Sequence, residues 1–276
     1  MELRKIGNDL LICNAENFDP FVSCECGQCF RFDKIDNEQY ALVACGRQLN
    51  IKKVSEGWLF LNIDEEEFNR KFVPYFDFER DYSAIIRSFS ADEAISRAAI
   101  HGGGIRIFRQ DPWETLVSFI ISQNNNIPRI KKIIQSLCRL LGDEKNGIYT
   151  FPSAEKILNA GIEGIAPIKS GFRAKYIIDA AEKVMSGKVS LDRIAIEGYE
   201  KALEELKLIK GVGDKVANCV LLFGFGYYEA FPIDVWVKRV IAKYYPEDFD
   251  PKALGKYAGI AQQYLFYYER SLEGEN

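Results

Sequence analysis

Long apolar stretches are missing from this sequence. No apolar run in its 276 residues approaches the roughly 18 residues that a membrane-spanning helix needs. The first residues, 1–13, are charged and contain neither the apolar core nor the cleavage site of a secretory signal. The sequence therefore predicts no membrane span, and we expect a cytoplasmic protein, associated with the nucleoid if the chain is prokaryotic.

Histidine is almost absent, and the cysteines follow no metal-binding pattern. His101 is the only histidine, and seven cysteines make an odd count that, without a secretory signal, suggests reduced thiols. Cys24, Cys26 and Cys29 lie close together, but their spacing to any fourth ligand matches no zinc motif well. A metal site on these cysteines is the weaker alternative, and we predict neither a metal nor an organic cofactor.

Acidic side chains slightly outnumber basic ones, 40 to 36, but the basic ones are unevenly distributed. The net charge is −4, which by itself argues against a partner of strong negative charge. Residues 101–243, however, carry 21 basic and 16 acidic side chains, an excess of 5, whereas residues 1–100 carry 12 and 18. A solvated helical face gives a similar count, so the excess is compatible with nucleic-acid binding without requiring it.

The spacing of apolar residues changes once along the chain. Up to about residue 80, short apolar or alternating runs are separated by turn residues, which predicts an antiparallel sheet with strands near 9–13, 29–32, 39–44, 48–51 and 58–63. From Tyr82 onward the period is helical, with expected N-caps at Asp81, Ser90, Asp111 and Ser153. We therefore predict an α+β fold, with an N-terminal antiparallel sheet domain (1–85) followed by a mainly α-helical region (86–276).

A glycine turn between two helical patterns is the most informative stretch. Gly211-Val212-Gly213 separates apolar residues at helical spacing on both sides, which predicts a helix-hairpin-helix. Glycine leaves the backbone bare, and the free amides at the start of the second helix favour a phosphate. This pattern is typical of a motif that binds the DNA backbone independently of the base sequence.

Lys215 and Asp234 are candidate catalytic side chains in and after this hairpin. Lys215 falls in the first turn of the second helix, where the helix dipole favours the neutral amine, and a neutral amine is a nucleophile. Asp234 follows in Pro232-Ile233-Asp234, at a position to cap the next helix. The alternative interpretation is a surface lysine and an ordinary N-cap aspartate.

This stretch resembles the HhH-GPD superfamily of DNA glycosylases, and other motifs resemble its 8-oxoguanine DNA glycosylase branch. Those motifs are Gly27-Gln28-Cys29-Phe30-Arg31, Gln110-Asp111-Pro112, and Asn124-Asn125-Asn126-Ile127-Pro128-Arg129. The resemblance covers nearly the whole chain. It implies a monomeric, bifunctional glycosylase and AP lyase that binds double-stranded DNA and removes 8-oxoguanine placed opposite cytosine. In this family Lys215 would be the nucleophile and Asp234 the essential carboxylate.

The resemblance also assigns contacts to the damaged base. The Gly27 carbonyl would accept the N7–H that 8-oxoguanine has and guanine lacks. Gln262 would bond the Watson–Crick edge of the extruded base, and Phe266 and Cys219 would enclose its two faces. Because a buried carbonyl facing N7 of normal guanine is left unpaired, this contact would discriminate between the two bases.

Further residues would hold the DNA. Asn124 would fill the vacated space, although three asparagines between helices also form an ordinary turn. Arg129 and Arg173 would read the orphaned cytosine, and Gly211 and Gly213 would bind phosphate. Two positions depart from the pattern of many members, since Phe172 replaces a wedging tyrosine and Trp236 replaces a histidine, which puts its contact with the DNA backbone in doubt.

Two alternatives remain at this point. Another glycosylase of the superfamily would act on alkylated purines or oxidised pyrimidines, but Lys215 argues against the lysine-less alkyl-base branch. The absence of a C-terminal four-cysteine cluster argues against the thymine-glycol branch and predicts no iron–sulfur cluster. A non-catalytic hairpin module would bind DNA without turnover, and in it Lys215→Gln would change little.

Overall fold

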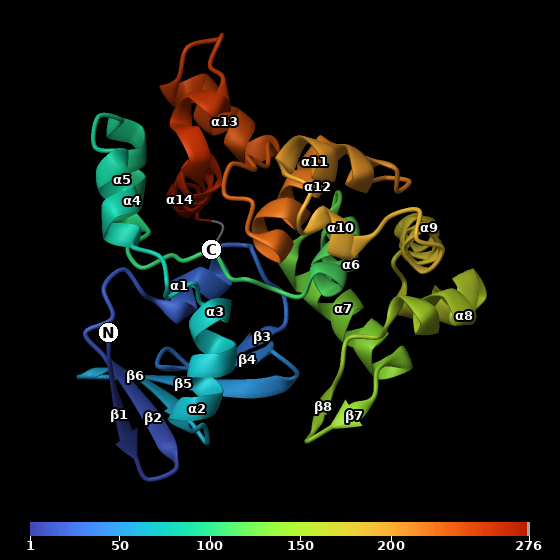
Figure 1. The fold of residues 1–276 in the computed structure, drawn as a ribbon, viewed down its shortest axis with the longest axis horizontal. Coiled ribbons are helices and arrows are strands. Elements are labelled where there is room, and N and C mark those ends of the chain that lie inside the picture. Colours follow the sequence, from blue (N-terminus) through green and yellow to red (C-terminus); the bar gives the residue numbers. More distant parts are fainter. Residues whose placement is uncertain (275–276) are drawn as a thin grey trace. The chain divides into compact units, whose positions relative to one another are not determined.

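The computed structural model describes residues 1–274, which divide into two compact units. The sheet unit contains Met1–Arg109 and the chain from Gln263 onward, and the helical unit contains Gln110–Gln262 (Figure 1). This division follows contacts in space, whereas the domain boundary expected near residue 85 follows the change of sequence pattern. A division by contacts does not test a boundary defined by sequence pattern, so the boundary at residue 85 stays a prediction.

Six antiparallel strands form the main sheet in the order β1-β2-β6-β5-β4-β3. The alternation of apolar and polar residues explains the pairing, because Leu10 and Ile12 of β2 face Phe60 and Trp58 of β6 from buried positions. The strands are β1 (Glu2–Ile6), β2 (Asp9–Cys13), β3 (Phe32–Lys34), β4 (Gln39–Ala44), β5 (Arg47–Val54) and β6 (Gly57–Leu61).

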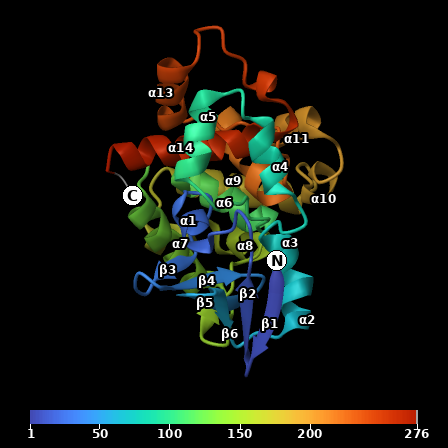
Figure 2. The ribbon, with the colours of Figure 1, turned by 90° about the vertical axis from the view of Figure 1, so that its left-hand side faces the viewer.

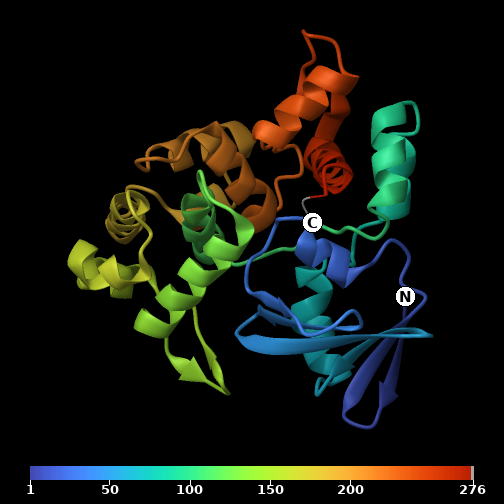
Figure 3. The same ribbon diagram turned by 180° about the vertical axis from the view of Figure 1, so that it is seen from behind.

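An aromatic core joins this sheet to a helical segment made of α2 (Glu65–Glu67), a π-helical turn (Phe68–Phe72) and α3 (Val73–Tyr75). The segment lies in front of the sheet in Figure 1 and behind it in Figure 3, so it covers one face. Phe60, Phe68 and Phe76 are completely buried and meet edge to face. Such pairs add to the free energy that apolar burial alone contributes.

Three more helices complete the sheet unit. These are α1 (Pro20–Glu25), α4 (Tyr82–Ser88) and α5 (Glu93–His101). Figure 2 shows α4 and α5 as separate neighbouring helices of this unit. The second part of α14 (Ala258–Leu272) also belongs to it, and the buried Tyr264 hydroxyl donates to the carbonyl of Ile105 at 3.0 Å.

The helical unit is built from consecutive helices and one small hairpin of strands. Its helices are α6 (Pro112–Ser122), α7 (Ile127–Leu141), α8 (Ala154–Ile165), α9 (Arg173–Met185), α10 (Leu191–Ile194), α11 (Tyr199–Lys207), α12 (Asp214–Val220) and α13 (Val235–Tyr244), with the beginning of α14. Strands β7 (Glu144–Lys145) and β8 (Ile148–Tyr149) pair with each other. Within residues 1–274, no helix is both long and apolar enough to cross a membrane.

The α+β fold is confirmed, and most element starts agree with the prediction. Asp81, Asp111 and Ser153 cap α4, α6 and α8 by accepting from backbone amides. The N-cap predicted at Ser90 is wrong, because Asp92 caps α5 by accepting from the Ile95 amide at 2.9 Å. Strand β1 was not predicted, since its exposed residues show no apolar alternation.

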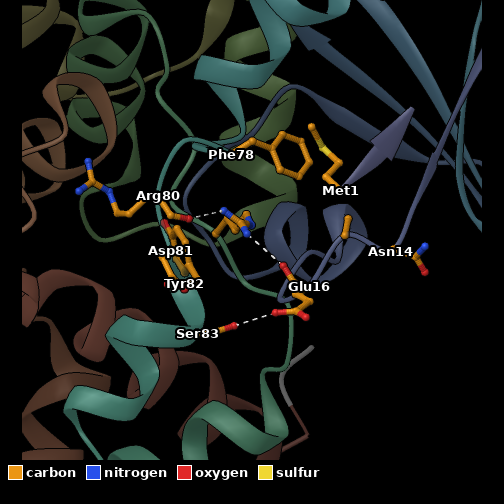
Figure 4. Close-up of a pocket in the computed structure, with 10 residues that line it drawn as sticks. Met1, Asn14, Glu16, Phe78, Arg80, Asp81, Tyr82 and Ser83 are labelled. Carbon is orange, nitrogen blue, oxygen red and sulfur yellow. Dashed lines mark hydrogen bonds between the residues drawn. The ribbon is translucent and has the colours of Figure 1, made fainter. Parts of the chain in front are cut away.

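None of the predicted site residues lines the pocket of the sheet unit that Figure 4 shows. Arg106 lines it, and its buried guanidinium donates to the carbonyls of Glu16 at 3.0 Å, Asn17 at 2.9 Å and Asp77 at 2.8 Å. These bonds join three separate segments, so Arg106 is a structural residue of this unit.

Candidate active site

The predicted hairpin is formed by α11, a turn and α12. Leu206, Ile209, Val212 and Val216 are buried, which accounts for their helical spacing in the sequence. The turn is closed when the Val212 amide donates to the Ile209 carbonyl at 3.0 Å, and the Ala217 amide begins α12 by donating to the Gly213 carbonyl at 3.0 Å. The first amides of α12 remain outside this ladder, as at any helix N-terminus.

The two glycines of the turn have different physical reasons. Gly211 has φ of 78°, and a Cβ placed there would lie 2.3 Å from the ring of Tyr176, so only glycine fits. Gly213 has φ of −101° and an exposed position, and a Cβ there would meet no atom within 4 Å. The fold therefore requires Gly211, whereas at Gly213 the bare backbone leaves room for a ligand.

Helix α9 packs against this turn and holds it by a hydrogen bond. Asp179 accepts from the Lys210 amide at 2.7 Å and forms an ion pair with Lys183 at 2.6 Å. Burial alone would raise the pKa of Asp179, but the Lys183 and Lys210 hydrogen bonds outweigh it and lower the pKa below its ordinary value. A charged carboxylate on α9 thus holds the loop that precedes the nucleophile candidate.

Lys215 lies half-buried in the first turn of α12. Its Nζ is 5.3 Å from the centre of the Phe119 ring on α6, and the Cys219 thiol lies near it, one turn later on α12. Burial raises the pKa of Cys219 to about 11; Lys215 opposes this rise and Asp234 adds to it. At neutral pH the thiol is therefore protonated, and the lysine is the nucleophile candidate of this group.

Asp234 caps α13 with one of its two carboxylate oxygens. Oδ1 accepts from the amides of Trp236 and Val237, both at 2.9 Å. Oδ2 accepts no hydrogen bond from any residue in the part of the chain that the structure describes. Asp234 and Lys215 both influence the pKa of the Cys219 thiol, so the two side chains lie near the same sulfur atom of the helical unit.

The sheet unit brings Gly27 and Phe266 together although they are far apart in the sequence. Gly27 has φ of 82°, and a Cβ added there would lie 3.2 Å from the Phe266 ring. The guanidinium of Arg270 stacks on this ring at 5.2 Å. The backbone of Gly27 and a half-buried aromatic face are thus adjacent, as the predicted contacts with a base require.

Gln262 is buried with its polar end incompletely satisfied. Only 4% of the side chain is exposed, and its Oε1 has no hydrogen-bond partner among the residues that the structure describes. Leaving such an acceptor unpaired costs about 1–3 kcal/mol. The unpaired Oε1 of Gln262 is therefore available to accept a hydrogen bond from a ligand.

The asparagine loop between α6 and α7 is held by Arg173. Asn124 is exposed with φ of 46°, and Asn126 caps α7 by accepting from the Arg129 amide at 3.0 Å. Arg173 is buried and donates to the carbonyls of Gln123, Asn124 and Ser170. Burial lowers the pKa of Arg173, and the positive charge of Arg129 adds to this effect.

Three predicted DNA contacts differ in their exposure. Arg129 is exposed, Phe172 is 50% exposed at the start of α9, and Trp236 is half-buried beneath Arg239 at 4.7 Å. Phe172 packs edge to face against Tyr176, with ring centres 5.8 Å apart. Arg129 and Phe172 are exposed to solvent and can contact a ligand, whereas the guanidinium of Arg173 is bonded to the loop.

Two family profiles match consecutive parts of the chain. The N-terminal domain of 8-oxoguanine DNA glycosylase matches residues 10–116, and the HhH-GPD superfamily of base excision DNA repair proteins matches residues 117–255. The chain belongs to the 8-oxoguanine DNA glycosylases of the HhH-GPD superfamily. The first matched range contains strands β3 to β6, and the second contains the glycine hairpin.

Solved structures of this family match over almost the full chain. MBOgg1 bound to a low-affinity DNA ligand is 40% identical, with a TM-score of 0.91 over 99% of both chains. The 8-oxoguanine glycosylase/lyase of Clostridium acetobutylicum, bound to double-stranded DNA with cytosine opposite 8-oxoG, is 37% identical with the same TM-score and coverage.

A sequence relative matches over a shorter region. The N-glycosylase/DNA lyase of Saccharomyces cerevisiae is 38% identical over 158 residues, which cover 51% of this chain and 42% of the yeast protein. The chain thus matches less than half of that relative's length, and the agreement is concentrated in part of the glycosylase fold.

Several residues that shape this glycosylase site were not predicted from the sequence. Phe119 faces Lys215, Tyr176 and Asp179 support the hairpin, and the buried Gln28 fixes the loop beside Gly27. Gln28 lies inside the motif Gly27-Gln28-Cys29-Phe30-Arg31, whereas Phe119, Tyr176 and Asp179 have no local sequence signal beyond ordinary helix composition. Cys24, Cys26 and Cys29 are buried free thiols, and the described residues contain no group of metal-binding side chains.

Proposed function

We propose that this glycosylase removes 8-oxoguanine from duplex DNA and then cleaves the strand at the resulting abasic site. The observation that carries the proposal is the placement of Lys215. Its amine lies at the start of α12, directly after a phosphate-binding glycine turn, against the Phe119 ring and beside Cys219. An amine there is within the first turn of the helix that faces the DNA backbone.

The proposed chemistry begins with attack of neutral Lys215 on C1′ of the damaged nucleotide. The C–N bond to the base breaks, its electron pair leaves with 8-oxoguanine, and the base takes up a proton. As the C1′–O4′ bond of the sugar breaks, one of the two amine protons moves to O4′ and the other passes through Asp234 to the departing base, which gives a Schiff base between Nζ and C1′. Removal of a C2′ proton then expels the 3′ phosphate by β-elimination, and water releases Lys215.

Asp234 would stabilise the positive charge that develops on the sugar. Its Oδ2 accepts no bond from the described residues, while Oδ1 is held by two amides of α13. A carboxylate that is already fixed in place needs no reorganisation when the charge develops. Asp234 would also take a proton from the attacking amine.

Base recognition would use backbone and side-chain contacts already present in each unit. The Gly27 carbonyl would accept N7–H of 8-oxoguanine, with the Phe266 ring beside it. In the helical unit, the unpaired Oε1 of Gln262 would accept a hydrogen bond from the base, and Cys219 would contact a base face. Normal guanine presents an acceptor at N7 and would lose the first of these bonds.

The DNA would be held by the hairpin and by the asparagine loop. The amides near Gly211 and Gly213 would bind phosphate, and Phe172 and Asn124 would occupy the place of the extruded nucleotide. Arg129 would read the opposite cytosine, and Arg173 would contribute through the loop that it holds. Trp236 would contact the backbone. As a DNA repair enzyme the protein would reside with the chromosome.

Borohydride trapping tests this proposal directly. The duplexes would carry 8-oxoguanine opposite cytosine, thymine glycol, or no damage. We expect a covalent adduct with the 8-oxoguanine duplex that is absent in Lys215→Gln, because only the amine can form a reducible Schiff base. The matched control is Lys201→Gln, an exposed lysine of α11. An adduct that persists in Lys215→Gln, or none with the parent, would contradict the proposal.

A further inference from the structure

We propose that Gln263 is a positioning residue for base discrimination, because its amide fixes the peptide that precedes the Gly27 carbonyl. This inference rests on the proposed function, in which that carbonyl accepts N7–H of 8-oxoguanine. It assigns a task to a residue that lies next to a predicted base contact but has no predicted role of its own.

The side chain of Gln263 is committed to the Gly27 loop. It is 2% exposed, and its Nε2 donates to the carbonyl of Cys26. The Cys26 carbonyl and the Gly27 amide belong to the same planar peptide group, so this bond sets the orientation of both. Phe266 follows three residues later on α14 and contacts Gly27, so one helix face both holds the peptide and supplies the ring.

A second buried glutamine holds the other side of the loop. The Nε2 of Gln28 donates to the carbonyls of Ser23 at 2.9 Å and Arg106 at 2.8 Å, and its Oε1 accepts from the Phe108 amide at 2.7 Å. Gln28 is completely buried. Residues 26 and 28 are thus both fixed, and the direction of the carbonyl between them has little freedom.

The backbone of Gly27 offers a carbonyl group to a ligand. Its φ of 82° is open to glycine, and its carbonyl oxygen accepts no hydrogen bond from the described residues. A carbonyl that is held at both neighbours and left unpaired is preorganised for a donor. Gln262 and Gln263 have different surroundings on α14, because neighbouring helical residues point about 100° apart. Gln262 keeps an unpaired oxygen, whereas Gln263 is bonded to Cys26.

Discrimination at N7 depends on this preorganisation. A fixed carbonyl bonds the N7–H of 8-oxoguanine and opposes the lone pair of guanine at the same atom. If the peptide tilts, the bond to 8-oxoguanine weakens and the carbonyl turns away from guanine. Loss of Gln263 should therefore lower the preference for the damaged base more than it lowers the affinity for DNA.

The experiment measures dissociation constants in a Lys215→Gln background, which prevents turnover. Duplexes carry either 8-oxoguanine or guanine opposite cytosine. We expect Gln263→Met to lower the ratio of the two affinities about tenfold, with no loss of affinity for the guanine duplex. Gln263→Asn keeps a polar side chain that is too short to reach Cys26, and it should have the same effect if the Met variant does not fold.

Tyr264→Phe is the matched control. It removes one buried hydrogen bond from the next residue of α14 to another backbone carbonyl, that of Ile105. It should lower the melting temperature as the Gln263 variants do, with the parent affinity ratio. An unchanged ratio in the Gln263 variants, or an equal loss for both duplexes, would overturn the inference.

Failure of the proposed function would look different. The parent enzyme would then show no preference for the 8-oxoguanine duplex and no trapped adduct at a preformed abasic site, which has no base to recognise. A parent that discriminates and is trapped, together with Gln263 variants that discriminate equally well, would overturn only the role of Gln263.

Discussion

At Asp234, one carboxylate oxygen caps a helix, and the other accepts no hydrogen bond from the residues that the structure describes. Oδ1 caps α13, and asparagine supplies an equivalent amide oxygen, so Asp234→Asn separates the cap from the charge. We expect Asp234→Asn to keep the melting temperature within a few degrees and to lower single-turnover excision by at least about 100-fold. Excision kinetics and thermal unfolding would be measured together.

Asp234→Ala provides the comparison. It removes the cap as well as the charge, so its free energy of unfolding should be about 1 kcal/mol lower than that of the Asn variant. Its rate of excision should be similar. A near-parent rate in Asp234→Asn would refute the electrostatic role, whatever the stability of the Ala variant.

At the scale of elements, α9 connects the two structures proposed to hold DNA in the helical unit. Its first residue, Arg173, binds carbonyls of the asparagine loop. One and two turns later, Tyr176 fills the space above Gly211 and Asp179 accepts from the Lys210 amide. The wedge candidate Phe172 precedes this helix and contacts Tyr176. Loop, wedge and hairpin therefore share one rigid support.

The two hairpin glycines separate the needs of the fold from those of the ligand. Gly211→Ala would force a Cβ into the Tyr176 ring at positive φ and should lower the free energy of unfolding by about 2 kcal/mol or more. Gly213→Ala meets no atom within 4 Å and should cost at most about 1 kcal/mol, while its methyl group crowds an approaching phosphate. Urea unfolding and binding to undamaged duplex would be measured for both.

The expected order of effects is opposite in the two measurements. Gly213→Ala should lose about tenfold in DNA affinity with nearly parent stability, because one amide–phosphate contact is weakened. Parent affinity in Gly213→Ala would show that phosphate does not approach this part of the turn.

At the scale of the whole molecule, buried thiols make stability sensitive to alkaline pH. Burial raises the pKa of Cys26 to about 12 and that of Cys219 to about 11, while an unfolded thiol titrates near 9. The folded state holds these protons longer than the unfolded state does. Their contribution is complete below about pH 9 and is lost as the pH rises toward the folded values.

Urea unfolding at pH 8 and pH 10.5 measures this loss. Each of the two thiols should lower the free energy of unfolding by about 1–2 kcal/mol between these pH values. Cys219→Ala should show a smaller loss than the parent, because it removes one of the groups. Equal losses in the two proteins would mean that the Cys219 thiol ionises alike in both states.

Local physics explains what could be predicted from the sequence. Asp81, Asp111, Ser153 and Asp234 cap helices because a short polar side chain reaches the amides two or three residues ahead. The strands with alternating apolar residues and the glycine turn are equally local. Where the alternation is weak, as in β1, or where two caps compete, as at Ser90 and Asp92, the local signal misses or misleads.

The α+β class, the hairpin, the family and the candidates Lys215 and Asp234 could all be predicted from the sequence, because motifs and periodicity lie within short stretches. The buried side chains that hold the site became apparent only from the folded chain. Gln263 reaches Cys26 across 237 positions, Gln28 reaches Phe108 across 80, and Arg173 reaches Gln123 across 50. Such bonds form because a buried polar group must find a partner wherever the packed chain brings one, and no local pattern records that distance.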